Sequence, residues 1–217
     1  MTQRRNLMTP VTHMRDARSL ISGLTTTGPD DAGTSVDDDR SLVARARKGD
    51  ERAFDQLVQR HQGVAYRAAR SLGGVEDVDD IVQDAFIKVH RRLDRYDPDR
   101  PFRPWLMAFV ANEASHRRRS RARRQNLAER FSSSPATSES TPEDEALVAA
   151  DRRKLWQALQ DLSEKDRRVI VYRHLLEMSE IETAAAIGCP VGTVKSRLAR
   201  ALKRLRVILS EASDHHG

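Results

Sequence analysis

The chain has 217 residues, which is enough for one domain or two small ones. Only 38% of the residues are apolar and 32% are charged, which argues against one large core and favours small helical units with wide surfaces. The net charge of +6 suits a polyanionic partner, the single cysteine excludes an intramolecular disulfide, and no apolar run approaches the roughly 20 residues of a membrane span.

The N-terminal segment, residues 1–38, is polar and has little hydrophobic periodicity. We therefore expect a disordered tail. Two origins are compatible with this composition: a regulatory extension, or a start codon assigned upstream of the true one. The segment also lacks the apolar core of a signal peptide, so we expect a cytoplasmic protein.

Residues 39–127 carry apolar positions at helical spacing, and no stretch alternates as a strand would. After a first short helix, Asp50 is suited to cap a second helix, Asp77 begins a third, and a fourth starts at about Arg103. This region therefore predicts an all-α domain. The fourth helix ends in a cluster of arginines: Arg117, Arg118, Arg119, Arg121, Arg123 and Arg124.

Residues 128–146 are rich in Ser, Thr and Glu, and we expect a flexible acidic linker there. A second helical domain is predicted over residues 147–212, followed by a short disordered tail at 213–217. Within the second domain Ser163 is suited to cap one helix, and another helix is expected over residues 179–187.

The segment after the turn Gly188-Cys189-Pro190 is the most informative of the chain. It is amphipathic to Leu209, with a basic and hydroxyl-bearing arc opposite its apolar stripe. A helix, a tight turn and a basic helix in this order predict a helix-turn-helix whose second helix reads the major groove. The alternative is that the basic arc is simply a solvated face. The apolar stripe consists of Val194, Leu198, Ala201, Leu202, Leu205, Ile208 and Leu209.

Five motifs in the right order resemble the sigma-70 family of bacterial RNA polymerase sigma factors, of the short extracytoplasmic-function (ECF, group 4) type. The resemblance covers about residues 39–212, and the recognition-helix segment 192–198 matches nearly letter for letter. It implies two helical domains, called sigma-2 and sigma-4, and no catalytic activity of the chain's own. The other motifs lie at residues 50–58, 77–86, 102–113 and 162–170.

The resemblance also implies three functional surfaces on an alternative sigma factor. One binds core RNA polymerase at its β′ clamp and involves Asp80, Gln83 and Asp84; the β flap of the polymerase is implied as a further contact, without assigned residues. A second reads melted −10 DNA through Asn112, His116, Arg117, Arg118 and Arg119. The third reads the −35 duplex through Thr193, Lys195, Ser196, Arg197 and Arg200. An anti-sigma factor is implied as a further partner, and the protein is expected to be a monomer, or one copy per holoenzyme.

Other interpretations of the residues stay open at this stage. The runner-up is a stand-alone helix-turn-helix regulator, and a nucleic-acid-processing enzyme is a third class for which no catalytic constellation is visible. No cofactor or metal motif is found. Cys189 is either a small apolar filler in the turn or a redox sensor. Thr183 stands where the family usually has a buried isoleucine, and His116 where an aspartate is common.

Overall fold

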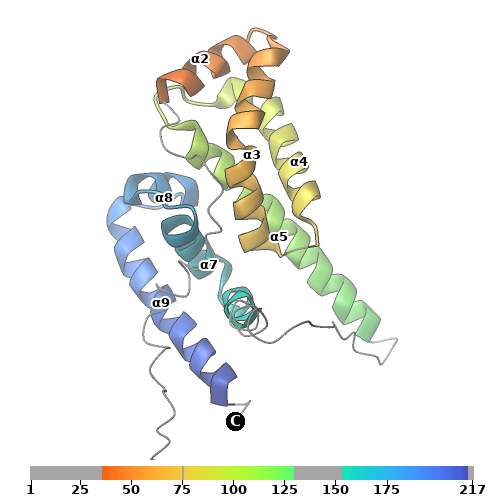
Figure 1. Cartoon of the computed structure of the whole chain (residues 1–217), viewed down its shortest axis with the longest axis vertical. Coiled ribbons are helices and arrows are strands. Elements are labelled where there is room, and N and C mark those ends of the chain that lie inside the picture. Colours follow the sequence, from red (N-terminus) through yellow and green to blue (C-terminus); the bar gives the residue numbers. More distant parts are fainter. Residues whose placement is uncertain (1–35, 75, 130–152, 215–217) are drawn as a thin grey trace, which may run out of the picture.

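The computed structural model describes residues 36–74, 76–129 and 153–214, and in these ranges the chain forms helices and no strand, so the all-α prediction is confirmed (Figure 1). Residues 128 and 129 of the expected linker are the last residues of helix α5 (Phe102–Glu129), whereas its remainder, residues 1–35 of the expected N-terminal tail and residues 215–217 of the expected C-terminal tail lie outside the described residues.

The first unit consists of α2 (Val36–Ala46), α3 (Glu51–Gly73), α4 (Val78–Arg91), the short η1 (Leu93–Arg95) and α5 (Phe102–Glu129). Helix α2 thus begins inside the segment assigned to the tail from the sequence.

Local capping chemistry sets two of these boundaries. The Asp50 carboxylate accepts a hydrogen bond from the Ala53 backbone N–H at 3.2 Å, which confirms the predicted cap of α3. Asp77 precedes α4 as expected, but its side chain makes no capping bond and instead pairs with Arg121 of α5. The start of α4 is therefore fixed to α5 by an ion pair.

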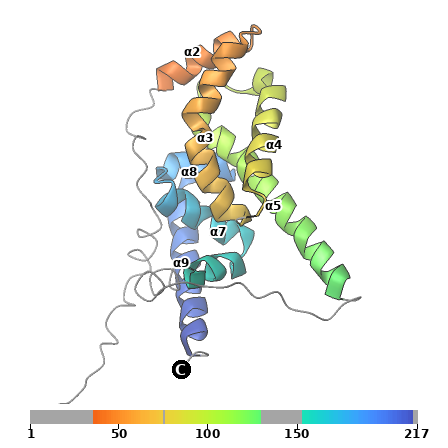
Figure 2. The same cartoon turned by 45° about the vertical axis from the view of Figure 1, so that its right-hand side comes forward.

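Helices α3, α4 and α5 pack together around a shared apolar core. Leu57, Ile81 and Leu106 are fully buried there, and burial of each such side chain contributes about 1.5–3 kcal/mol. Gly73 allows α3 to lie close to α4 and α5, because a Cβ atom at this position would lie 2.5 Å from Ile81 Cδ1 and 3.4 Å from Ala114 Cβ. The C-terminal part of α5 projects beyond the other helices (Figure 2).

The second unit contains a helical segment over residues 153–161, α7 (Glu164–Ile170), the π turn η2 (Val171–Leu175), α8 (Glu180–Ile187) and α9 (Val191–Asp214). Ser163 accepts from the Asp166 N–H, as predicted, and caps α7. Ser179 and Glu182 form a reciprocal capping box at the start of α8. These local signals explain why the second unit begins its helices where the sequence indicates.

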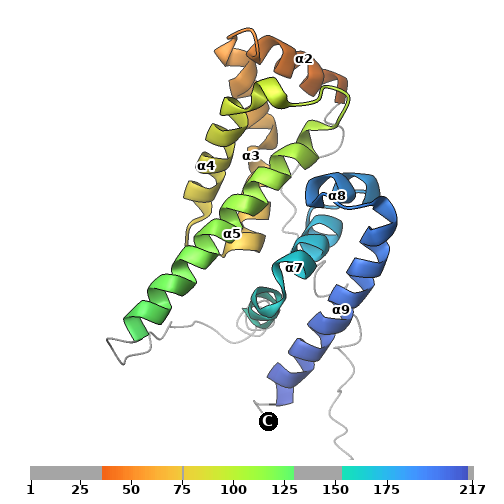
Figure 3. The same ribbon diagram turned by 180° about the vertical axis from the view of Figure 1, so that it is seen from behind.

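The two units are packed against each other. Helix α8 contacts α5, and η2 contacts α3. Buried side chains from both units belong to one continuous hydrophobic cluster, which includes Met107 of α5 and Tyr172 of η2. Helix α9 lies on the side of α7 and α8 that is remote from the first unit (Figures 1 and 3).

Candidate nucleic-acid interface

Helices α8 and α9 form the predicted helix-turn-helix. Gly188 ends α8 in the left-handed conformation, with φ of 74°, which glycine adopts without the steric cost of a Cβ atom. Pro190 stands immediately before α9, where its missing N–H costs no intrahelical hydrogen bond. Val194, Ala201 and Leu205 of α9 are completely buried, so the apolar stripe faces α7 and α8.

The opposite face of α9 is open. Lys195, Ser196 and Arg200 are exposed, while Thr193 and Arg197 are half-buried. The Ser196 hydroxyl donates to the Thr193 carbonyl at 3.1 Å, and the Arg200 guanidinium donates to the Ser196 carbonyl at 3.2 Å. These contacts are local to α9, and a longer ion pair of 3.7 Å joins Lys195 to Glu180 of α8. Such exposed contacts contribute little and are readily exchanged for phosphate or base edges.

The packing of α8 contains one unusual group. Thr183 is completely buried, as its place in the predicted helix implied. Its hydroxyl oxygen has no hydrogen-bond partner among the described residues. A buried hydroxyl without a partner costs about 1–3 kcal/mol. The first helix of the helix-turn-helix is therefore less stable than an apolar side chain at this position would make it.

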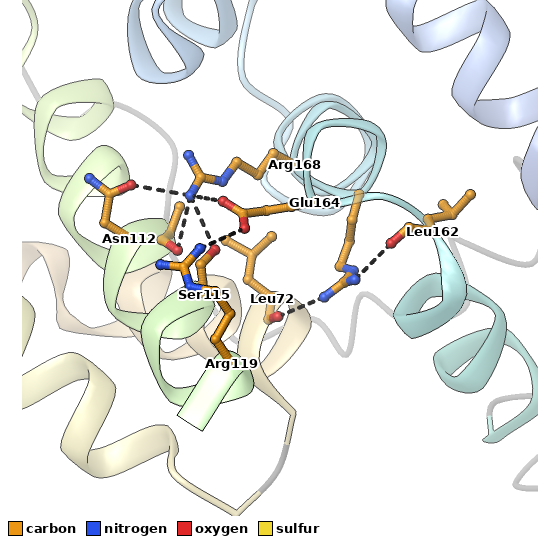
Figure 4. Close-up of polar contacts among 9 residues, drawn as sticks. Leu72, Asn112, Ser115, Arg119, Leu162, Glu164 and Arg168 are labelled. Carbon is orange, nitrogen blue, oxygen red and sulfur yellow. Dashed lines mark hydrogen bonds and ion pairs between the residues drawn. The ribbon is translucent and has the colours of Figure 1, made fainter. Parts of the chain in front are cut away.

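The residues predicted to read −10 DNA lie on α5 and are placed very differently. Asn112 and His116 are exposed and one helical turn apart, as the spacing predicted. The Asn112 side-chain oxygen, however, accepts a hydrogen bond at 3.1 Å from Arg168 of α7 (Figure 4). Arg168 also donates to the Ser115 hydroxyl at 3.2 Å.

Two predicted phosphate-binding arginines also contact the second unit. Arg118 donates to the Gln160 carbonyl at 3.1 Å, and burial lowers the pKa of its guanidinium. Arg119 lies 3.4 Å from the carboxylate of Glu164, which also accepts from Arg168 (Figure 4). No local sequence pattern indicates these contacts, because the partners lie more than 40 positions away along the chain.

The predicted polymerase-binding residues of α4 are brought next to the predicted DNA-binding residues of α5. Arg117 donates to Asp80 at 2.9 Å and to Asp84 at 2.8 Å. The hydrogen bond to Asp84, opposed by burial, raises the pKa of Arg117 further above its ordinary value. Gln83 is exposed on α4, the helix that carries Asp80 and Asp84. Two surfaces that are separate in the sequence therefore share an edge along α4 and α5.

An apolar groove adjoins this edge. It has a volume of about 390 Å³ and lies between α3 and α4, with Gln83 at its border and the partly exposed side chains of Tyr66 and Ile87 in its wall. A hydrogen bond to Asp79 raises the pKa of the Tyr66 hydroxyl. Sequence periodicity did not identify this groove, because it lies beside the inward stripes of both helices.

A buried arginine, also missed from the sequence, connects the two units. The Arg167 side chain is only 2% exposed, and its guanidinium donates to the carbonyls of Leu159, Gln160 and Leu162 at 2.7–2.9 Å. It also donates to the Leu72 carbonyl at the end of α3 at 3.2 Å. One guanidinium thus caps helix C-termini from both units. Burial, with a smaller effect of nearby Arg118, lowers its pKa to about 9, so it is charged at neutral pH.

Aromatic side chains fill the junction between η1 and α5. The Trp105 ring lies 5.0 Å from the rings of both Tyr96 and Phe109, and Phe102 is nearly fully buried beside them. Trp105 is half-buried in this cluster, which favours a packing role over a base-stacking one. Burial raises the pKa of Tyr96 to about 12.

Residues 36–74, 76–129 and 153–214 contain no group of three or more His, Cys, Asp or Glu side chains that could hold a metal ion. None of their helices combines the length and the hydropathy that a membrane crossing requires.

Comparison with known proteins identifies the family. The models of sigma-70 region 2 and sigma-70 region 4 match residues 57–124 and 152–205. The RNA polymerase sigma factor CnrH of Cupriavidus metallidurans is 38% identical over 186 residues, covering 82% of this chain and 97% of that protein. The ECF RNA polymerase sigma-E factor of Escherichia coli is 37% identical over 171 residues, covering 75% and 90%.

Solved structures agree with these matches. The structure of CnrH in complex with the cytosolic domain of CnrY covers 80% of this chain and 98% of that chain, with 38% identity and a TM-score of 0.59. The sigma factor RpoE in complex with the anti-sigma factor NepR, from Bartonella quintana, covers 72% and 96%, with 28% identity and a TM-score of 0.54.

The chain therefore belongs to the sigma-70 family of RNA polymerase sigma factors, and within it to the ECF type. It is an alternative sigma factor that directs transcription initiation, and the interpretation as a stand-alone regulator is not favoured. Its relatives are sigma factors, which are not enzymes in the catalytic sense.

Proposed function

We propose that α9 reads the −35 element as duplex DNA through Thr193, Lys195, Ser196, Arg197 and Arg200. The observation that carries this proposal is the open basic face of α9, held on a capped helix-turn-helix in which Val194, Ala201 and Leu205 of the opposite face are fully buried. Small and hydroxyl side chains permit close approach to base edges, and guanidinium groups bind guanine or phosphate.

The face of α5 is proposed to bind the non-template strand of the melted −10 element. Asn112 and His116 are suited to one flipped base, because they lie one turn apart and reach the surface together. Arg117, Arg118 and Arg119 follow along the same helix and supply positive charge for the phosphates of a single strand.

Core RNA polymerase is proposed to dock on α4 through Asp80, Gln83 and Asp84. The apolar groove between α3 and α4 is continuous with this surface at Gln83, so it extends the same interface. The partner surface should be basic and carry apolar side chains, as a clamp helix would. A second polymerase contact, at the β flap, is assigned to the second unit.

The remaining assignments follow from the family. The relative RpoE is solved with an anti-sigma factor and CnrH with the cytosolic domain of CnrY, and we assign this chain a partner of the same kind. It acts in the cytoplasm, as a monomer or as one copy per holoenzyme, without a cofactor and without catalysis of its own.

The test is in vitro transcription from a genomic fragment library, with purified core polymerase in the presence and absence of the protein. Discrete start sites that need the protein are expected, and alignment of their upstream sequences gives the −35 and −10 elements. Core polymerase that gains no start sites, from the full chain or from a chain lacking residues 1–38, would contradict the proposal.

The residue assignments have their own controls in this assay. Lys195→Ala should lower initiation at every mapped promoter, whereas Lys48→Ala, at an exposed position after α2 that is not assigned to any of the three surfaces, should not. Asp80→Asn should weaken core binding in pull-down without changing the start-site sequence that the remaining holoenzyme selects.

A further inference from the structure

The groove between α3 and α4 leaves large apolar side chains at the surface of the folded chain. Its volume is about 390 Å³, and in its wall Tyr66 is 41% exposed and Ile87 is 40% exposed. Val58 and Phe86 form part of the same wall. Exposed apolar surface of this kind marks a site for a partner, and a groove between two helices suits the apolar face of a third helix.

The two ends of this groove carry opposite charges. At the beginning of α4 the wall contains Asp79, which accepts a hydrogen bond from Tyr66, and the exposed Asp80 follows it. At the end of α4 the wall contains His90 and Arg91, both exposed. An occupant that complements the groove is therefore amphipathic, with basic residues facing the beginning of α4 and acidic residues facing its end.

One stretch of the sequence outside the described residues has this pattern. Periodicity is weak across residues 1–38 as a whole, but the apolar side chains of residues 14–24 recur at the spacing of one helix face. Arg15 and Arg18 lie beside this apolar stripe, and two aspartates, at positions 30 and 31, follow it along the chain. The stripe consists of Met14, Ala17, Leu20, Ile21 and Leu24.

The described chain begins near the basic end of the groove. Helix α2 starts at Val36, and at its other end Arg45 pairs with Asp50 at 2.7 Å, immediately before α3 (Figure 1). One turn into α3, the Phe54 ring packs edge-on against the His90 ring, with 4.7 Å between the ring centroids. The start of the described chain is therefore little more than the length of α2, about 17 Å, from this end of the groove.

The lengths of the segments fit a helix that runs along the groove in one direction. Residues 25–35 span at most about 36–40 Å when extended, which exceeds the distance from the start of α2 to the groove. A helix over residues 14–24 is about 17 Å long, and so is the stretch of α4 from Asp79 to His90. With Leu24 at the basic end of the groove, the two arginines of the helix lie at the acidic end, and the aspartates that follow it stay at the basic end.

A second groove, of about 470 Å³, complements this stretch less well. It lies between α7 and α9, and its wall carries charges of both signs. Asp161 and Asp166 face Lys203 and Arg204 across it, and Arg204 is paired with Asp166. Because this groove has no separate acidic end for the two arginines, charge favours the groove between α3 and α4.

We propose that residues 14–24 bind intramolecularly, as a helix, in the groove between α3 and α4 and compete there with core RNA polymerase. The inference rests on the proposed docking of the polymerase on α4 at Asp80, Gln83 and Asp84. The groove adjoins that surface at Gln83, so a helix in it covers the apolar part of the polymerase interface. Of the two origins considered for the N-terminal segment, this role corresponds to a regulatory extension.

The decisive variant of the full chain is Ile21→Glu, with Ser19→Glu as its matched control. Both add one negative charge, but Ile21 belongs to the apolar stripe and Ser19 falls on the opposite side of the same helix. The affinity for purified core polymerase is measured by fluorescence anisotropy of the chain labelled at its C-terminus. Ile21→Glu should bind core about tenfold more tightly, because the fraction of chains with an open groove rises. Ser19→Glu should change the affinity by less than about twofold.

Photo-crosslinking tests occupancy of the groove without polymerase. Benzoylphenylalanine replaces Gln62, an exposed residue of the groove wall, or Ser210, an exposed residue of α9. Irradiation of the full chain should join position 62 to residues 14–24 within one molecule, as mapped by mass spectrometry. Position 210 should not give this product. Ile21→Glu should remove the product from position 62, whereas Ser19→Glu should retain it.

Absence of the product at position 62, or a crosslinked dimer in its place, would overturn the inference. A crosslink that forms while Ile21→Glu leaves the core affinity unchanged would also overturn it, because the helix would then not compete with the polymerase. Failure of the proposed function is a separate result, in which core polymerase binds neither the parent chain nor Ile21→Glu. A protein that binds core but gives no crosslink would retain the proposed function and refute the inference alone.

Discussion

The two proposed DNA-reading surfaces of this protein differ in how they are presented. The face of α9 is open and makes only local contacts, whereas the face of α5 is bound by groups from α7 and by the carboxylates of α4. Duplex DNA offers its groove edges without rearrangement, but a −10 strand is accessible only after melting. If the proposed roles hold, the chain exposes the surface for the early contact with duplex DNA and covers the surface for the later contact with the melted strand.

Among the substitutions that test this comparison, Arg167→Ala is expected to have the largest effect on stability. It removes the guanidinium that caps helix ends in both units, so several buried carbonyls lose their donor. We expect a loss of about 2–4 kcal/mol in the free energy of unfolding, measured by urea denaturation. Arg206→Ala, at an exposed position of α9, should change stability by less than about 0.5 kcal/mol. Equal effects of the two substitutions would show that Arg167 is not a structural cap.

Arg200→Ala acts on the open surface alone. If Arg200 contacts a guanine through two hydrogen bonds, holoenzyme binding to −35 duplex should weaken by about 1–3 kcal/mol, measured by fluorescence anisotropy. Binding to a scrambled −35 duplex should weaken much less. A loss of the same size on both duplexes would identify a phosphate contact instead.

Thr183→Val should stabilise the helix-turn-helix, which carries one of the two surfaces compared. The substitution replaces a buried hydroxyl without a partner by a methyl group of nearly the same volume. The free energy of unfolding should rise by about 1 kcal/mol, and −35 affinity should be unchanged. Thr193→Val, at a half-buried position of α9, is the matched control and should not stabilise. A destabilised Thr183→Val variant would mean that the hydroxyl has a partner in solution.

Asp84→Asn is expected to have the smallest effect on stability, because ion pairs at this degree of exposure contribute less than about 1 kcal/mol. Its functional effects should be opposite on the two surfaces that meet at Arg117. Core polymerase binding should weaken in pull-down, while the affinity of the free protein for a single strand should rise modestly. Asp55→Asn, at an exposed position of α3, controls for the change in net charge. A loss of both polymerase binding and strand binding would show that the Asp84 contact does not hold Arg117 away from the strand.

The parts of the fold that sequence predicted are those set by nearby residues. Asp50 and Ser163 cap their helices because a carboxylate or hydroxyl reaches an N–H three residues away, and the apolar stripe of α9 is visible as a period. Gly188 marked the turn because glycine adopts the left-handed conformation there without the steric cost of a Cβ atom. The candidate −35 residues follow directly, since the exposed face of a helix is fixed once its buried face is known.

The interface between the units was not predictable in this way. Nothing near Arg167 and Arg168 in the sequence reveals that their acceptors include Leu72 and Asn112. Likewise the arginines of α5 indicated attraction to phosphates, and their engagement by Glu164 depends on how two units dock. The residues next to a long polar side chain in the sequence do not show which distant residue it will contact in the fold.

The shared cap at Arg167 constrains how this chain could be recombined with its relatives. The Arg167 guanidinium reaches back across the turn at residues 162–163 to the Gln160 and Leu162 carbonyls, and at the same time to the Leu72 carbonyl. A residue inserted into this turn would change the position of the guanidinium relative to the end of α3. A chimera that exchanges the second unit must therefore keep the length and register of residues 159–168 against α3.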